Sequence, residues 1–134
     1  MILGIDPGER RVGVAIADDE TRFARPLEVI DLREVDAPER IAALVDELNI
    51  RMIVIGRPVG LSGRAGPAVE AQKIFVDAVR TAVAVQVVEY DERLTSVVAE
   101  QGLRAAGADR GARKRIKDAV AAQVMLQGYL DGRA

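Results

Sequence analysis

Hydrophobic and polar positions along the first thirty residues predict three strands. Residues 2–6 form a short apolar run that ends in a carboxylate, and residues 11–17 alternate β-branched side chains with glycine or alanine. A weaker run covers residues 23–30, where Pro26 favours an edge strand or a bulge. Turn-forming residues separate the second and third runs. The pattern therefore predicts an antiparallel meander.

The remaining chain alternates helices with strands. Asp36 can cap a helix and Glu39 completes a capping-box-like pair, so a helix is predicted to begin here and to stop near Asn49. The unbroken apolar run at residues 52–55 is typical of a strand buried on both faces, and residues 85–89 make a fifth strand. Three further helices are predicted. One begins at Pro67, one extends from Thr95 to about Ala106, and the last spans residues 114–131.

This order, βββαβαβαα, predicts one α/β domain over residues 1–134 with a mixed five-stranded sheet. For the helix that begins at Pro67, the spacing predicts that one stripe of side chains faces inward. That stripe consists of Ala68, Ala71, Phe75, Ala78 and Val79.

Composition narrows the chemistry that this domain can perform. The chain of 134 residues is 49% hydrophobic and contains no cysteine and no histidine. Disulfides, thiolate metal sites and Ser-His-Asp triads are therefore excluded. No apolar run approaches the length of a membrane span, and the amino terminus lacks a signal-peptide pattern. We expect a cytoplasmic protein without a membrane partner.

Charge is unevenly distributed along the chain. The formal net charge is −2, yet residues 104–117 hold six basic side chains against the single acid Asp109. Arginine, which suits bidentate phosphate contacts, supplies 16 of the 19 basic residues. A basic cluster of this kind attracts nucleic acid whatever the net charge of the whole protein.

Three aspartates occupy the ends of predicted elements. Asp6 follows the first strand, Asp91 follows the fifth strand, and Asp118 lies near the start of the last helix. Because a carboxylate beside a core is costly unless a cation neutralises it, such residues are candidate metal ligands. In a chain without histidine or cysteine, the three carboxylates indicate an oxygen-ligand site for a hard cation.

Each aspartate also has an ordinary structural interpretation. Asp6, Pro7 and Gly8 together could form a simple turn, whereas in a functional site Asp6 would bind metal and Gly8 would let a substrate approach. Asp91 could serve a helix entry near Thr95. Asp118 could complement a helix dipole, but it shares a helical stripe with Ala122, Met125 and Tyr129, which favours a buried role.

The loop at residues 56–66 contains four glycines and is too long for a plain strand-to-helix turn. Its spacing differs from a Walker A motif, because no Gly-Lys-Ser/Thr sequence ends it. Arg57 and Arg64 make it a candidate phosphate-contacting flap. A glycine-rich surface loop without function is the alternative interpretation.

Taken in order, four segments resemble the YqgF family, also called RuvX, of RuvC-like resolvase homologues. They are residues 4–8 (GIDPG), 55–58 (IGRP), 91–95 (DERLT) and 118–122 (DAVAA). The resemblance covers nearly the whole chain, and DERLT between the first and last aspartates is its most specific part. The sequence departs from the family in the loop, at Arg57 and Ser62, and it offers no obvious fourth acid beyond Glu92 or Glu89.

The resemblance implies a ribonuclease H-like fold with strand order 3-2-1-4-5 and strand 2 antiparallel. It implies a nuclease that uses Mg²⁺ or Mn²⁺ and matures the 5′ end of pre-16S ribosomal RNA; family members are also described as candidate Holliday junction resolvases, acting on branched DNA. Carried over by position, the catalytic acids are Asp6, Asp91 and Asp118, with Glu92 as a weaker fourth ligand. The expected nucleic-acid contacts are Arg57, Arg64, Arg93, Arg113, Lys114 and Lys117.

Two cations held by carboxylates can hydrolyse a phosphodiester without histidine, which suits this composition. An actin- or sugar-kinase-like nucleotide site is one rival, but it needs two domains to close over ATP. A non-catalytic binding module is another, since a fold does not fix a function. Junction resolution would also require a homodimer for paired cuts, and no dimer face is evident in the sequence.

Overall fold

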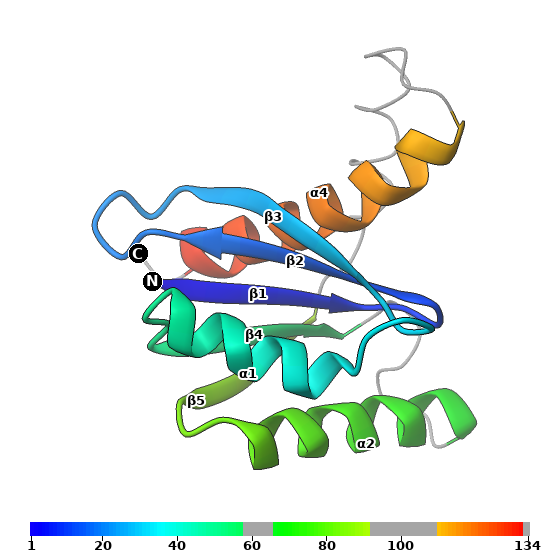
Figure 1. Ribbon diagram of the computed structural model, residues 1–134. Coiled ribbons are helices and arrows are strands. Elements are labelled where there is room, and N and C mark those ends of the chain that lie inside the picture. Colours follow the sequence, from blue (N-terminus) through cyan, green and yellow to red (C-terminus); the bar gives the residue numbers. More distant parts are fainter. Residues whose placement is uncertain (58–65, 92–109, 133–134) are drawn as a thin grey trace.

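The computed structural model describes residues 1–57, 66–91 and 110–132, without the side chains of residues 110–116 (Figure 1). The five strands are β1 (Ile2–Pro7), β2 (Arg11–Ala17), β3 (Ala24–Asp31), β4 (Met52–Arg57) and β5 (Gln86–Asp91). The helices are α1 (Ala37–Glu47), α2 (Pro67–Ala82) and α4 (Arg110–Asp131). The helix predicted from Thr95 to about Ala106 lies outside the described residues.

The strands form one sheet in the order β3-β2-β1-β4-β5. The pairs β1–β2 and β2–β3 are antiparallel, whereas β1–β4 and β4–β5 are parallel. This arrangement confirms the predicted meander, the strand order 3-2-1-4-5 and the antiparallel second strand. Because β1, β4 and β5 run in the same direction, their carboxyl ends meet at one edge of the sheet.

Local signals in the sequence act as expected. Asp36 caps α1, and its carboxylate accepts a hydrogen bond of 3.0 Å from the backbone N–H of Glu39. Asn49 adopts φ 52° just after that helix, a left-handed conformation that asparagine tolerates. In β3 the register shifts opposite Val14 and Ala15, where Pro26 pairs with Ala15 on this edge strand. The bulge predicted at Pro26 is confirmed.

Each face of the sheet carries its own hydrophobic core, because successive strand residues point to opposite faces. Leu3, Ile5 and Ile55 belong to the core beneath α1 and α2. Ile2 and Val54 belong to the core beneath α4. Figure 1 shows α4 on one side of the sheet and α1 and α2 on the other. Within one strand, residues two positions apart therefore point to the same face. We call this shared alternation the parity of a residue.

Two glycines allow α4 to approach the sheet closely. A Cβ atom placed on Gly4 of β1 would lie 2.9 Å from the Cβ of Leu126. A Cβ on Gly13 of β2 would lie 1.9 Å from the carbonyl oxygen of Asp118, a separation that no side chain can occupy. The helix α4 thus packs on the small-residue face of β2 that the sequence predicted.

Two predictions about helices need correction. In α2 Val79 is buried and Phe75 packs against the core, as predicted. Val76 is also buried, whereas Ala68 and Ala71 are exposed. Figure 1 shows the first turn of α2 extending past the end of β4, so its early residues have little sheet to cover. The last helix begins at Arg110 instead of residue 114. No described helix, α4 included, combines the length and apolarity needed to cross a membrane.

Candidate functional site

Asp6 lies inside β1 instead of following it. It pairs with Gly13 across the antiparallel β1–β2 ladder, one residue before the strand ends at Pro7. Its parity is that of Ile2, so its side chain points to the α4 face, and the residue is half-buried. The carboxylate is therefore placed where the carboxyl end of β1 meets the underside of α4.

The backbone of Asp118 rests on the glycine that faces Asp6. Gly13 is the cross-strand partner of Asp6, and the carbonyl oxygen of Asp118 occupies the space that a side chain of residue 13 would fill. Directly opposed residues in an antiparallel pair lie about 4.5–5.5 Å apart. The fold thus brings Asp6 and Asp118 together from opposite ends of the chain.

Asp118 is held by an arginine that the sequence reasoning did not identify. The Nε of Arg11 donates a hydrogen bond of 2.6 Å to Oδ2 of Asp118. The side chains of Arg11 and Asp118 keep 31% and 25% of their exposure, so this ion pair is only partly screened by solvent. One feature of the sequence could have indicated this contact. Arg11 lies two positions before Gly13 in β2, so its side chain points to the face on which α4 packs.

The position of Asp118 within its helix excludes the helix-dipole interpretation. Because α4 begins at Arg110, Asp118 lies in the third turn, and the dipole effect fades within the first. Its predicted stripe is buried as expected, with Ala122 and Met125 at 0% exposure and Tyr129 at 7%. The carboxylate therefore begins a stripe that faces the sheet.

Asp91 lies at the same edge of the sheet, two strands away from Asp6. It is the last residue of β5 and pairs with Arg57 of β4. Neighbouring strands lie about 4.8 Å apart, so roughly 10 Å separates the backbones of β1 and β5. Asp91 has the parity of Val87, which belongs to the core beneath α1 and α2, so the alternation assigns Asp91 to the α2 face.

Among the side chains that the structure describes, no group of three or more acidic residues lies close enough to hold a metal ion. Glu92, Arg64 and Arg93 lie outside the described residues, as do the side chains of Arg113 and Lys114. Lys117 is half-exposed on α4, directly before Asp118. The described part of the site thus consists of the Asp6–Asp118 pair and, along the edge, Asp91.

The donor set suits a divalent cation. Two carboxylates on one face supply hard oxygen ligands of the kind that Mg²⁺ and Mn²⁺ prefer, and histidine and cysteine ligands do not occur in the chain. Arg11 already places one positive charge on Asp118, so a metal ion would have to compete with Arg11 for that carboxylate.

Gly8 has a structural role in the hairpin between β1 and β2. A Cβ at this position would lie 2.6 Å from the carbonyl oxygen of Arg11. The close approach that requires glycine is therefore made by the chain's own backbone. The substrate approach predicted for Gly8 is not needed to explain this residue.

The sequence is similar to those of known proteins over nearly its whole length. A family model described as RuvX, Holliday junction resolvase, matches residues 1–132. A protein of Chloroflexus aggregans named "Putative pre-16S rRNA nuclease" is 47% identical over 133 residues, covering 98% of this chain and 94% of its own. A protein of the same name from Bacillus subtilis is 39% identical over 133 residues, covering 97% of this chain and 96% of its own.

Solved structures agree with the fold. The chain resembles T. thermophilus RuvC in complex with a Holliday junction substrate, with a TM-score of 0.59, 20% identity, and coverage of 98% of this chain and 94% of that one. It also resembles the fowlpox virus resolvase in complex with Holliday junction DNA, with a TM-score of 0.55 and 11% identity over 98% and 97% of the two chains. The predicted ribonuclease H-like fold is confirmed.

Proposed function

This chain belongs to the RuvX family, and from that membership we propose that it is a metal-dependent nuclease that hydrolyses phosphodiester bonds. The observation that carries the proposal is the convergence of Asp6 and Asp118 over Gly13 at the carboxyl edge of the sheet. Carboxylate oxygens are the ligands that hard divalent cations prefer, and such ions promote the hydrolysis of phosphate esters. An ATP-dependent kinase would need a second domain.

Precursor 16S ribosomal RNA is the proposed substrate, cleaved at its 5′ end. The curated relatives at 39–47% identity carry the name of a pre-16S rRNA nuclease. Four-way DNA junctions are the second candidate, because the matching family model is described as a Holliday junction resolvase. Junction resolution would additionally require a homodimer, since two symmetric cuts need two sites.

Mg²⁺ or Mn²⁺ would be held by Asp6 and Asp118 on the α4 face. Asp91 lies at the same edge but on the α2 face, so it would join this ligand set only if its side chain turned toward β1. Glu92 is the weaker proposed ligand. When bound, such ions would supply an activated water and stabilise the negative charge on the phosphate oxygens. The chain's own residues prepare the site. Gly13 lets α4 bring Asp118 beside β1, and Arg11 fixes the orientation of its carboxylate.

Basic residues around this edge would hold the nucleic-acid backbone. Arginine and lysine contact phosphates without reading sequence, so they position a strand across the carboxylates. The proposed contacts are Arg57, Arg64, Arg93, Arg113, Lys114 and Lys117.

The function is tested with Asp6→Asn and a matched control, Asp46→Asn, at an exposed position on α1. Cleavage of single-stranded RNA, precursor ribosomal RNA and four-way junctions is measured with Mn²⁺ and with Mg²⁺. We expect Asp6→Asn to lower turnover on the order of a hundredfold or more, because charge stabilisation in the transition state is lost. The Asp46→Asn control keeps its activity.

Asp6→Asn should also leave the metal-free protein as stable as wild type or slightly more stable, because removing one carboxylate of the proposed site would relieve repulsion among its acids. Calorimetry measures this effect. Wild-type turnover by Asp6→Asn would remove Asp6 from the site, and absence of metal-dependent cleavage by the wild-type protein on every substrate would overturn the nuclease proposal.

A further inference from the structure

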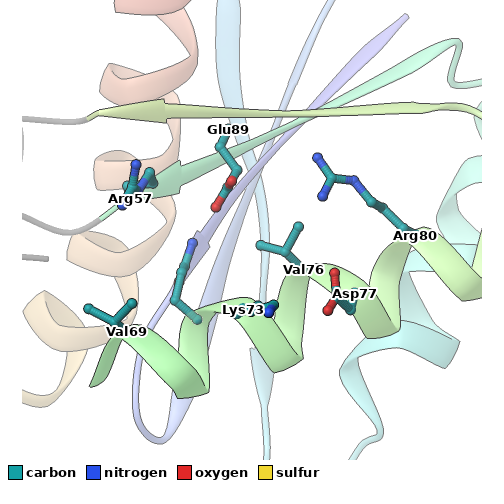
Figure 2. A pocket seen from close by; sticks show the side chains of 8 residues that line it. Arg57, Val69, Lys73, Val76, Asp77, Arg80 and Glu89 are labelled. Carbon is teal, nitrogen blue, oxygen red and sulfur yellow. The ribbon is translucent and has the colours of Figure 1, made fainter. Parts of the chain in front are cut away.

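A cavity of about 310 Å³ lies between α2 and the β4–β5 edge, away from the Asp6–Asp118 pair. Figure 2 shows side chains from β4, β5 and α2 around it. Its lining includes three cations and two anions, together with the amide of Gln72. These charged residues are Arg57, Lys73, Arg80, Asp77 and Glu89.

Arg57 enters this cavity with an unsatisfied donor. In the part of the chain that the structure describes, its Nε is the one buried side-chain nitrogen or oxygen atom without a hydrogen-bond partner. A buried donor without an acceptor is costly, and more so when the group is charged. Such an atom is explained when a ligand supplies the missing acceptor.

The acids of the cavity do not supply that acceptor. Among the described residues, no ion pair within 4.0 Å joins Asp77 or Glu89 to Arg57, Lys73 or Arg80. Arg80 donates to the backbone carbonyl of Val87 at 3.2 Å, which holds its guanidinium against β5. The cations therefore carry one more unit of charge than the acids, and the surplus favours an anion.

The location of the cavity relates it to the proposed nuclease site. Arg57 is the register partner of Asp91, and both residues have the parity of the α2 face. The cavity thus opens beside Asp91, on the side of the edge away from α4. Gln72 donates to the carbonyl of Gly56 at 3.2 Å and so fixes α2 against the end of β4 beside Arg57.

We propose that this cavity binds one backbone phosphate of the nucleic-acid strand, apart from the phosphate that is cleaved. The inference rests on the proposed nuclease function and deepens it. Arg57 would donate to a phosphate oxygen through its guanidinium group, with Lys73 and Arg80 adding charge from α2. Guanidinium groups bind phosphate oxygens well because their donors lie in one plane. The strand would then run from the Asp6–Asp118 pair across Asp91 to α2.

Binding of a labelled single-stranded RNA is measured by fluorescence anisotropy in Ca²⁺, as a non-cleaving ion, over a range of salt concentrations. The variants are Arg57→Gln and Lys73→Gln, and the control is Arg25→Gln, at an exposed position on β3 at the far end of the sheet. We expect each cavity variant to weaken binding. Arg57→Gln should also flatten the salt slope by about 0.7, the value for one lost contact on a single strand. The control leaves both quantities unchanged.

A second measurement identifies the phosphate. Oligonucleotides carrying a single neutral methylphosphonate are scanned through the binding site. We expect one position to weaken binding to wild type severalfold and to have no effect on Arg57→Gln, because both changes remove the same contact. Lys73 is exposed on α2, so Lys73→Gln should fold normally. If Arg57→Gln does not fold, the salt dependence of RNA binding is compared between wild type and Lys73→Gln.

Three results would overturn the inference. The first is a salt slope that stays unchanged in both cavity variants. The second is a methylphosphonate scan with no position that depends on Arg57. The third is inorganic phosphate or a mononucleotide binding as tightly as the RNA, which would make the cavity a small-ligand site. Metal-dependent cleavage by wild type continues in each of these cases, so the nuclease function is judged separately.

Discussion

Gly13 is the residue on which the candidate site depends most directly, although it carries no reactive group. The carbonyl oxygen of Asp118 fills its side-chain space, and Asp6 is its cross-strand partner. A single missing Cβ thereby lets the backbone of Asp118 lie beside the strand pair that carries Asp6, although the two aspartates are far apart in the sequence.

Gly13→Ala should move α4 away from β2, because its Cβ would lie 1.9 Å from the Asp118 oxygen. Overpacking of this kind typically lowers the free energy of unfolding by about 1–3 kcal/mol. We expect a lower melting temperature and weaker Mn²⁺ binding, measured by calorimetry. Gly132→Ala is the matched control, since its Cβ meets its nearest neighbour at 3.4 Å. Equal effects of the two variants would contradict the account.

Arg11 binds the carboxylate oxygen of Asp118 that a metal ion would also bind, so the two cations would compete for it. Arg11→Gln removes the positive charge that lies 2.6 Å from Oδ2. We therefore expect a lower melting temperature without metal and a severalfold tighter Mn²⁺ affinity, since one cation repels another. Isothermal titration measures the affinity. A tenfold weaker affinity would instead make Arg11 necessary for placing the carboxylate.

At the scale of elements, the strands could be predicted from the sequence because burial leaves a local pattern. The runs at residues 2–6 and 52–55 are apolar since both faces of the sheet are covered, and β2 alternates because α4 needs small residues beneath it. The stripe of α4 that includes Met125 was predicted in the same way, and Met125 is fully buried.

The parts that escaped prediction depend on contacts between distant residues. Arg11 and Asp118 are 107 positions apart, and no local pattern links them. The exposed face at Ala68 and Ala71 depends on where α2 extends past the sheet. The roles of Asp6, Asp91 and Asp118 were strengthened by a family resemblance, because spacing alone also fits a turn, a helix entry and a helix dipole. The structure removes only the last of these alternatives.

Asp19, which follows β2, connects the starts of β1 and β4 at the end of the sheet opposite the candidate site. Its carboxylate accepts hydrogen bonds of 2.5 Å from the amino group of Met1 and from Nε of Arg51, which precede β1 and β4. Hydrogen bonding from that amino group, followed by Arg51, holds the pKa of Asp19 below its usual value of 3.8.

A depressed pKa in the folded protein means that this stabilisation is present above pH 3.8 and is lost as the pH falls through the folded value. Asp19→Asn should lower the free energy of unfolding near neutral pH by at most about 1 kcal/mol, because the group is exposed and screened. The difference from wild type should shrink in acid. Thermal melts across pH measure it, and a difference independent of pH would assign the effect to packing.

At the scale of the whole molecule, the candidate metal site joins the two ends of the chain. Asp6 belongs to the first strand and Asp118 to the last helix, which packs across β1, β2 and β3. An ion held by both carboxylates would bind the folded protein and not the unfolded chain. Its binding free energy would therefore add to the stability of the entire fold.

Mn²⁺ at 100 times its dissociation constant should stabilise the wild-type protein by about 2.7 kcal/mol. For a chain of 134 residues this corresponds to a rise in melting temperature on the order of 10 °C. Asp118→Asn removes a proposed ligand whose backbone lies against Gly13, so the variant should fold and should lose most of this rise. Asp46→Asn should keep it. Scanning calorimetry with and without Mn²⁺ decides the matter: an equal rise in wild type and Asp118→Asn would mean that the ion binds elsewhere and that α4 contributes no ligand.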